Sequence, residues 1–212
     1  MKKIKILFQG DSITDANRDK RNYHDLGSGY PKYASELIAK AFPDVEFEFI
    51  NFGISGNRTS QLFDRLHSDC ISFQPDIVSI MIGVNDIWHR FNVEMILTTD
   101  EQIELNYKCI LERIKNETNA QILLLQPFTE GNRMSHLRAG VEKTKIIVNN
   151  LAEKYADAYV KTDDVMHADE NYGKPDHFTG DGVHPNATGA EFIAKLYFDA
   201  VSPLIEKIIS NS

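Results

Sequence analysis

The sequence is poor in cysteine and lacks long hydrophobic runs. Its two cysteines, Cys70 and Cys109, lie far apart without CxxC spacing, so we expect reduced, packed thiols in a reducing compartment. No stretch approaches the roughly 20 apolar residues that a membrane-spanning helix needs. The start, Met1-Lys2-Lys3, has the charge of a signal peptide, but the apolar run Ile4–Phe8 is too short and ends at Gln9-Gly10-Asp11. These absences predict a soluble, cytoplasmic protein that is not embedded in a membrane.

Basic residues are also scarce. The chain has 23 Lys and Arg residues against 31 Asp and Glu, a formal net charge of -8, and no local basic patch. Such a charge repels phosphate backbones, so we expect no nucleic-acid partner. At 42% hydrophobic and 25% charged, the composition excludes disorder. The 212 residues contain no repeats and no Pro/Gly-rich linker, which predicts a single domain over residues 1–212.

Short β-rich runs alternate with longer helical patterns. The expected strands are Lys3–Phe8, Glu46–Phe52, Asp76–Ile82, Gln121–Leu125 and Ala158–Lys161. The expected helices are Tyr30–Ala41, Thr59–Phe73, Asp100–Lys115, a segment from about Ser135 to Tyr155, and Ala187–Ile209. Thr99 and Gln102 form a capping pair before the third helix, and we expect the last helix to break or restart at Pro203. This alternation predicts an α/β protein, a three-layer α/β/α sandwich around a five-stranded parallel sheet.

A serine follows the first expected strand, in Gly10-Asp11-Ser12-Ile13-Thr14. In open α/β sheets, ligands bind in the crevice outside the carboxyl ends of the strands, so Ser12 is placed to reach a ligand. By itself this segment is also compatible with a plain turn or a helix N-cap, because Asp and Ser are common in both.

Two further segments follow the second and third expected strands. In Asn51-Phe52-Gly53-Ile54-Ser55-Gly56-Asn57 the glycines permit close approach of the backbone, and Gly56 is a candidate N–H donor. In Gly83-Val84-Asn85-Asp86, the Asn85 amide can point into the same crevice and suits an oxyanion. Each segment taken singly is equally compatible with a strand-to-helix turn or a helix cap.

The last segment, Asp181-Gly182-Val183-His184-Pro185, places a carboxylate and an imidazole three residues apart just before the final helix. A short loop can bring the carboxylate of Asp181 against Nδ1 of His184 and leave Nε2 free for a serine hydroxyl. A surface turn or half of a metal site are the alternatives for this segment. The four segments together occur at strand ends or a helix entrance, in the order that one active site requires.

Together the four segments resemble the blocks of the SGNH hydrolases, also called the GDSL family, with Ile13 in place of the family's leucine. The resemblance implies a flavodoxin-like fold and an esterase in which Ser12 is the nucleophile, His184 the base and Asp181 the group that orients it. It implies an oxyanion hole made by the N–H groups of Ser12 and Gly56 and the side-chain amide of Asn85. It implies no metal and no cofactor, and it makes a homo-oligomer plausible.

Longer stretches resemble intracellular acetylxylan esterases within that family. These stretches are Gly10–Asp15, Gly29-Tyr30, Gly53–Asn57, Ser79–Trp88, Pro127-Phe128 and Glu130-Gly131-Asn132. The resemblance implies a small ester substrate, such as an acetylated xylo-oligosaccharide. The candidate substrate-binding residues are Asp11, Tyr30, Asn57, Arg58 and Trp88. A lysophospholipase or thioesterase, and a non-catalytic carbohydrate-binding relative, remain alternatives.

Two histidines and two loops are weighed beside this set. His177 is close in sequence to His184 and is interpreted as a surface or supporting residue at the entrance, while His89 follows the Asn85 segment and is a possible substrate contact. The irregular stretches Asn17–Ser28 and Pro127–Met134 are long enough to shape a pocket.

Overall fold

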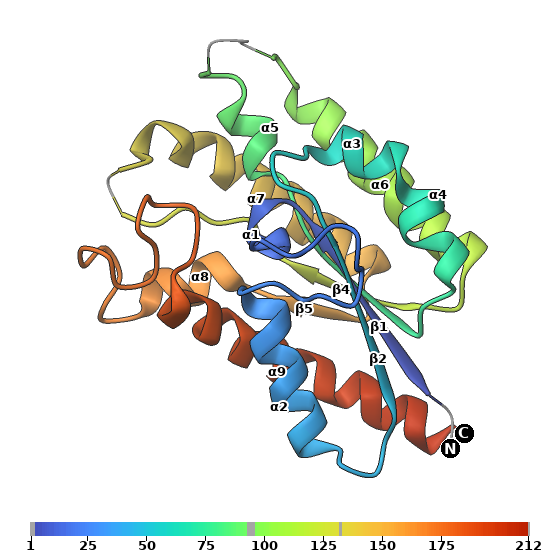
Figure 1. Cartoon of the computed structure of the whole chain (residues 1–212). Coiled ribbons are helices and arrows are strands. Elements are labelled where there is room, and N and C mark those ends of the chain that lie inside the picture. Colours follow the sequence, from blue (N-terminus) through green and yellow to red (C-terminus); the bar gives the residue numbers. More distant parts are fainter. Residues whose placement is uncertain (1–2, 93–95, 132, 212) are drawn as a thin grey trace.

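A computed structural model describes residues 3–92, 96–131 and 133–211, so Met1, Lys2 and Asn132, on which the sequence analysis drew, lie outside the described residues. Five strands form one sheet in the order β2-β1-β3-β4-β5, and all neighbouring pairs are parallel (Figure 1). The strands are β1 (Ile4–Gly10), β2 (Phe47–Gly53), β3 (Ile77–Met81), β4 (Gln121–Leu125) and β5 (Ala158–Val160). The predicted five-stranded parallel sheet is confirmed.

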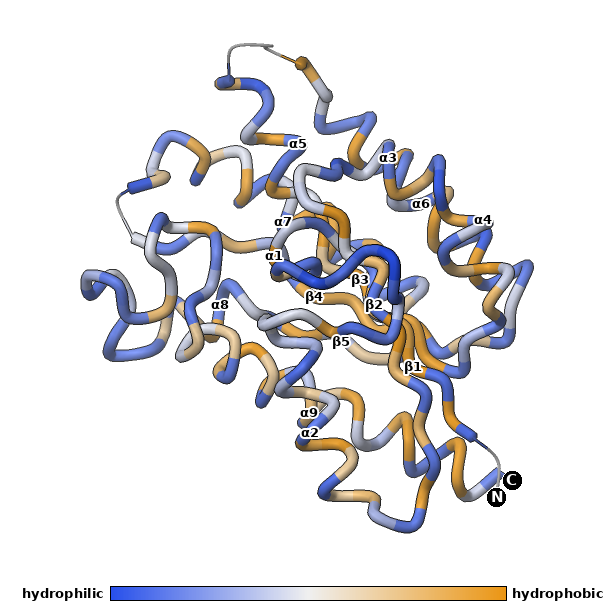
Figure 2. The backbone as a smooth tube through the Cα atoms, viewed as in Figure 1, coloured by the Kyte–Doolittle hydropathy of each residue, from blue (hydrophilic) through white to orange (hydrophobic). Residues whose placement is uncertain are grey.

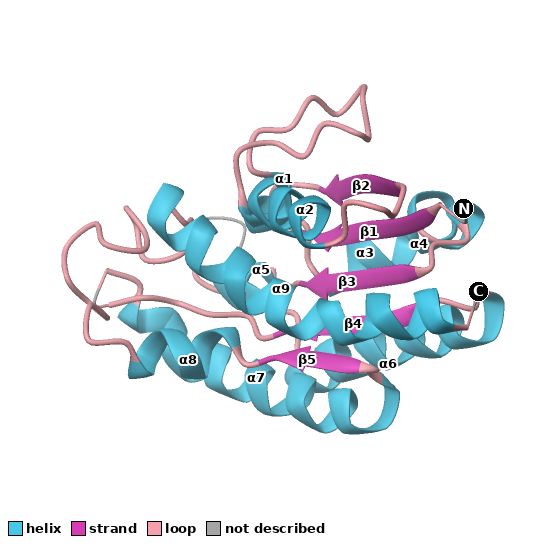
Figure 3. Ribbon diagram, turned by 90° about the horizontal axis from the view of Figure 1, so that it is seen from below, coloured by secondary structure: helices cyan, strands magenta, loops and turns pink. Residues whose placement is uncertain are grey.

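Helices cover both faces of this sheet. On one face α2 (Tyr30–Ala41) and α9 (Ala187–Ser210) pack side by side and cross the strands (Figure 3). The opposite face carries α3 (Thr59–Asp64), α6 (Asp100–Glu117) and α7 (Ser135–Tyr155), which pack against one another in that order (Figure 1). The predicted three-layer arrangement is therefore confirmed. In the part of the chain that the structure describes, no helix combines the length and hydrophobicity needed to cross a membrane.

The hydrophobic core lies between the layers. Every residue of the central strand β3 is buried, as its nearly all-apolar sequence predicts for a strand covered on both faces. Figure 2 shows the hydrophobic segments gathered at the sheet and the hydrophilic ones at the periphery. The predicted capping pair is also confirmed, because Gln102 N donates to Thr99 Oγ1 at 3.2 Å and Thr99 N donates to Gln102 Oε1 at 2.8 Å.

Two helix predictions are wrong. The expected helix Thr59–Phe73 is divided into α3, α4 (Leu66–Asp69) and a 3₁₀ turn (Ile71–Phe73), with Arg65 between the first two. The Arg65 side chain turns inward and bonds the end of β1, a tertiary contact that periodicity does not encode.

The expected break at Pro203 does not occur, because α9 continues through it to Ser210. A proline inside a helix removes one hydrogen bond and costs about 3 kcal/mol. Here Pro203 itself is exposed, whereas Val201, Leu204 and Ile205 beside it are buried in the core. Burial of three such side chains contributes several times about 1.5 kcal/mol and outweighs that cost.

Three short helices were not predicted, namely α1 (Ser12–Asp15), α5 (Val84–Trp88) and α8 (Thr162–Ala168). The first two begin directly beyond β1 and β3, which are neighbours in the sheet. The chain leaves β1 toward β2 on one side and later returns to β3 on the other, so the carboxyl ends of β1 and β3 form a topological switch point. A crevice at such a point is the expected ligand site of this strand order.

Candidate active site

Ser12 is the first residue of α1 and lies at the switch point. Asp11 caps this short helix, its Oδ1 accepting from Ile13 N at 3.0 Å. The chain then reverses through two left-handed residues, Ala16 and Asn17, with φ of 41° and 62°. The Ser12 side chain faces the crevice, where its Oγ lies 2.9 Å from Nε2 of His184, although the two residues are 172 positions apart.

His184 is held by Asp181 in the loop before α9. Nδ1 of His184 lies 2.6 Å from Oδ2 of Asp181, while Oδ1 of the same carboxylate accepts from Val183 N at 2.9 Å and His184 N at 2.7 Å. Partial burial acts to raise the pKa of Asp181, but these hydrogen bonds prevail and lower it below its ordinary value. The carboxylate is therefore ionised at neutral pH and fixes the imidazole with Nε2 toward Ser12.

Two predicted oxyanion donors lie beside Ser12. Gly56 has φ of 80°, a left-handed conformation that suits glycine, and together with Asn85 it lines the same hollow as Ser12 and His184. Asn85 Nδ2 donates to Asn57 O at 3.1 Å, which fixes the orientation of the amide group. An amide nitrogen carries two protons, so one remains for a ligand oxygen.

Two adjoining hollows meet at Ser12, Ser55 and His184. One, of about 330 Å³, is lined in addition by Ala16, Asn17, Ser28 and Gly29, with Ile13 and Pro185. The other, of about 280 Å³, is lined in addition by Gly56, Asn85, Trp88, His89 and Asn92. Ser12 thus lies where two small hollows meet.

Three polar side chains that sequence reasoning missed hold the crevice together. Asp86 accepts from Thr59 N at 3.0 Å and from Thr59 Oγ1 at 2.7 Å, which joins α5 to the start of α3. Burial raises the pKa of Asp86 above its ordinary value. Arg65 donates to Gly10 O at 3.1 Å and to Asn57 Oδ1 at 2.8 Å, so it links the end of β1 to the Gly56 loop. Asp86 belongs to the third quoted segment, but no sequence pattern indicates the contacts of these three residues, because their partners are distant in the chain.

Two of the candidate substrate contacts are not brought to the crevice. Asp11 and Tyr30 are each 1% exposed, and the Tyr30 hydroxyl lies 3.3 Å from Thr14 Oγ1 inside the core. Burial raises the pKa of Asp11 to about 7 and that of Tyr30 well above its usual range. Both residues lie beneath α1 and support it, so the geometry gives them a structural role in place of a substrate contact.

Asn57 and Arg58 are also engaged with the protein. Asn57 bonds Asn85 and Arg65, as described above, and Arg58 donates to Gln61 Oε1 at 3.2 Å and to Thr98 Oγ1 at 3.4 Å. Neither residue lines the described parts of the two hollows. Trp88, by contrast, lines the smaller hollow, and its ring centroid lies 5.9 Å from that of His184, while its remaining surface packs against the core.

The two irregular loops have different positions. Asn17 and Ser28, at the ends of the first loop, line the hollow of about 330 Å³ beside Ser12, as predicted. The described part of the second loop, residues 127–131 and 133–134, contacts the Asp181–His184 segment instead, where Glu130 N donates to Gly182 O at 2.7 Å. It therefore contributes to the site from outside the crevice.

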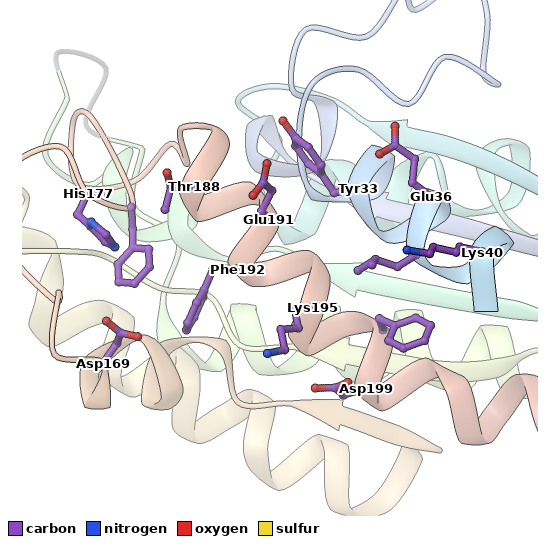
Figure 4. A pocket seen from close by; sticks show the side chains of 13 residues that line it. Tyr33, Glu36, Lys40, Asp169, His177, Thr188, Glu191, Phe192, Lys195 and Asp199 are labelled. Atoms are coloured by element: carbon purple, nitrogen blue, oxygen red, sulfur yellow. The ribbon is translucent and has the colours of Figure 1, made fainter.

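A larger hollow of about 820 Å³ lies away from Ser12, on the outer surface of α2 and α9 (Figure 4). Its labelled side chains include Tyr33 and Lys40 from α2, Phe192 and Lys195 from α9, and His177. His177 thus faces this surface and not the crevice entrance. This hollow is larger than either hollow at Ser12, but Ser12, Asp181 and His184 are not among the residues that line it.

Comparison with known proteins agrees with this geometry. The sequence matches the GDSL-like lipase/acylhydrolase family over residues 8–192. It is 31% identical over 201 residues to acetylxylan esterase of Geobacillus stearothermophilus, covering 91% of each chain. It is 28% identical over 186 residues to thioesterase 1/protease 1/lysophospholipase L1 of Escherichia coli K12, covering 85% of this chain and 81% of the relative.

The fold is also similar to those of solved structures. The fold matches a GDSL-like lipase from Parabacteroides merdae with a TM-score of 0.88 and 32% identity, covering 94% of this chain and 95% of that one. It matches the Geobacillus acetylxylan esterase with a TM-score of 0.82 and 29% identity, covering 92% and 93%. Structures of that esterase include catalytic mutants with one serine or one histidine changed to alanine. This chain therefore belongs to the GDSL-like lipase/acylhydrolase family of carboxylic ester hydrolases.

Proposed function

We propose that the protein is a serine esterase in which Ser12 is the nucleophile, His184 the general base and Asp181 its orienting partner. The observation that carries the proposal is the continuous chain of contacts, 2.9 Å from Ser12 Oγ to His184 Nε2 and 2.6 Å from His184 Nδ1 to Asp181 Oδ2. Both distances are within hydrogen-bond reach, which proton transfer between nucleophile and base requires.

The proposed reaction has two halves. Ser12 Oγ passes its proton to His184 Nε2 and attacks the ester carbonyl, and the N–H groups of Ser12 and Gly56 with the Asn85 amide stabilise the resulting oxyanion. The tetrahedral intermediate collapses as His184 protonates the departing alcohol, which leaves an acyl group on Ser12. Water, deprotonated by His184, then releases the acid and restores Ser12.

The test is hydrolysis of p-nitrophenyl acetate by Ser12→Ala. We expect kcat to fall at least about 10³-fold, because the covalent route is lost and only binding and the oxyanion donors remain. Ser72→Ala, which removes an exposed hydroxyl that donates to Ser68 O, serves as the control and retains parental kcat. Labelling of the parent by a fluorophosphonate should map to Ser12 by peptide mass spectrometry. Unchanged activity in Ser12→Ala would contradict the proposal.

For the substrate, we propose an acetylated carbohydrate such as a xylo-oligosaccharide. The similarity to an acetylxylan esterase supports this choice, as do the small hollows of about 330 and 280 Å³ on the two sides of Ser12. The Trp88 ring lines one of them and offers an apolar face for a sugar ring. Hollows of this size suit an acetyl group better than a long acyl chain.

A thioesterase or lysophospholipase is the second candidate, because the E. coli relative of that description is 28% identical. A product assay across acetylated xylo-oligosaccharides, long-chain esters and acyl-thioesters separates the two. The proposal predicts the highest kcat/KM with the acetylated oligosaccharides. Preference for long acyl chains would replace this substrate while leaving the Ser12 mechanism intact, and binding of the oligosaccharide without any hydrolysis would indicate a carbohydrate-binding relative.

We also propose that the protein acts in the cytoplasm and assembles with copies of itself. Cys70 and Cys109 are both free thiols, with Cys70 buried, which suits a reducing compartment. Cell fractionation tests the first point, and light scattering coupled to size-exclusion chromatography tests the second. A single species with the 24.1 kDa mass of one chain would contradict assembly.

A further inference from the structure

Glu130, in the loop before α7, contacts the middle of the segment that carries Asp181 and His184. Glu130 N donates to Gly182 O at 2.7 Å, and Gly182 N donates to Thr179 Oγ1 at 3.0 Å. The Thr179 hydroxyl in turn donates to Glu130 Oε2 at 2.7 Å. Both polar groups of the Gly182 backbone are thus held by one connected pair of residues, Glu130 and Thr179.

The fit around Gly182 is tight. Gly182 has φ of 95°, and a Cβ atom at this position would lie 2.9 Å from Glu130 O and 3.2 Å from Met134 Cγ. Glu130 and Thr179 are only 4% exposed, so little solvent competes for their hydrogen bonds. An isolated bridge between Thr179 and Pro185 closes the segment from the other end. The conformation at Gly182 is consequently set by its neighbours and not by local preference.

Gly182 connects the hydrogen bonds of Glu130 and Thr179 to the side chains of Asp181 and His184. The preceding residue, Asp181, places Oδ1 on the N–H groups of Val183 and His184 and Oδ2 on the imidazole. A rotation of the Gly182 peptide would turn the Asp181 carboxylate away from those three donors. The exposed side chains need this support, because Asp181 and His184 are 44% and 43% exposed and little packing restrains them.

We propose that Glu130 and Thr179 are positioning residues that hold Gly182, and through it Asp181 and His184, in the geometry needed for catalysis. This inference rests on the proposed function of Ser12, His184 and Asp181. By analogy with the outer partners of metal ligands, whose removal typically costs about 10- to 100-fold in activity, we expect a loss of this size here. Neither Glu130 nor Thr179 touches the substrate hollows, so their effect should appear in kcat and not in substrate binding.

The test pairs disruptive and conservative variants of each residue. Thr179→Val keeps the shape of the side chain and removes the hydroxyl, whereas Thr179→Ser keeps the hydroxyl. Glu130→Leu removes the acceptor, whereas Glu130→Gln retains one oxygen. With p-nitrophenyl acetate we expect Thr179→Val and Glu130→Leu to lose about 10- to 100-fold in kcat with KM within about 2-fold. The conservative variants should stay within about 3-fold of the parent.

The matched control is Thr162→Val. Thr162, the first residue of α8, is fully buried, and its Oγ1 lies 3.5 Å from the O atom of Val160, the last residue of β5. The variant therefore removes a buried hydroxyl outside the segment that carries Asp181 and His184. Its kcat should equal that of the parent. A fall in kcat of the same size in Thr162→Val would mean that general loss of packing explains the effect, and it would overturn the proposal.

Two results separate this inference from the proposed function. If Ser12→Ala retains activity, the proposed function fails. If Ser12→Ala is inactive while folded Thr179→Val and Glu130→Leu keep the parental kcat, only the positioning role is overturned. Amide exchange on the parent protein provides a test without substitution. The Gly182 N–H should exchange far more slowly than that of the exposed Gly173. Equal rates would contradict a stable hydrogen bond from Gly182 N to Thr179.

Discussion

The two halves of the crevice are built in different ways. Ser12, Gly56 and Asn85 follow β1, β2 and β3, three adjacent strands whose ladders fix where each chain emerges. Asp181 and His184 follow no strand and lie in a loop held by side-chain and backbone hydrogen bonds. The sheet therefore positions the proposed nucleophile and the proposed oxyanion donors, whereas a network of separate contacts positions the proposed base. Substitutions should separate these two kinds of support.

The largest effect on activity is expected in the loop that carries Asp181 and His184. His184→Ala removes the proposed base, and kcat for p-nitrophenyl acetate should fall at least about 10³-fold. His177→Ala is the matched control and should retain parental activity, because His177 lies in the loop before α9 and lines the outer hollow over α2 and α9. An equal loss in both variants would show that histidine replacement harms the fold and not the chemistry.

On the strand side, Asn85→Ala should slow turnover about 100-fold, since one oxyanion donor is worth roughly 3 kcal/mol in the transition state. KM should change little, because the developing charge exists only in the transition state. Steady-state kinetics separates the two parameters. A rise in KM with unchanged kcat would place Asn85 in substrate binding and remove it from the oxyanion hole.

The strand side also depends on Arg65, which ties Gly10 to Asn57 from a position with 13% side-chain exposure. Arg65→Met should lower the free energy of unfolding by roughly 2–4 kcal/mol, because several buried acceptors lose their donor. Urea denaturation measures this change. Arg113→Met, which removes a pair with Glu117 on the surface of α6, should cost less than about 1 kcal/mol. Equal costs would mean that Arg65 does not join the two segments.

Per pH unit, the smallest effect concerns Asp11 beneath Ser12. Burial raises the pKa of Asp11 from 3.8 to about 7. Between these two pH values the Asp11 carboxyl is protonated in the folded protein and ionised in the unfolded chain. Its contribution to stability is therefore lost as the pH rises from about 4 to about 7, at up to about 1.4 kcal/mol per pH unit.

Asp11→Asn removes this dependence and can keep an acceptor for Ile13 N. The melting temperature of the variant relative to the parent should be higher at about pH 8 than at about pH 5. A difference that stays constant with pH would show that Asp11 is ionised in the folded protein across this range.

The sequence predicted most of the fold, and the structure brings Ser12, Asp181 and His184, which the sequence singled out, within hydrogen-bond distance of one another. Strand positions were found because a strand buried on both faces, such as Ile77–Met81, is almost entirely apolar. The helix predictions failed where a tertiary contact overrode a local rule, at Arg65 and at Pro203. Similarly, Asp11 and Tyr30 were candidate substrate contacts in the light of the family resemblance, but both are buried.

The sequence by itself determined the fold class and the set of chemical groups, because alternating apolar runs specify a parallel sheet and short segments beyond the strands carry the reactive side chains. Only the tertiary structure decided that Ser12 Oγ and His184 Nε2 lie 2.9 Å apart, and that Glu130 and Thr179 hold Gly182 between Asp181 and His184. The physical reason is that hydrophobic periodicity reports burial along one segment. Hydrogen bonds between distant segments depend on how the whole chain packs and leave no periodic signal.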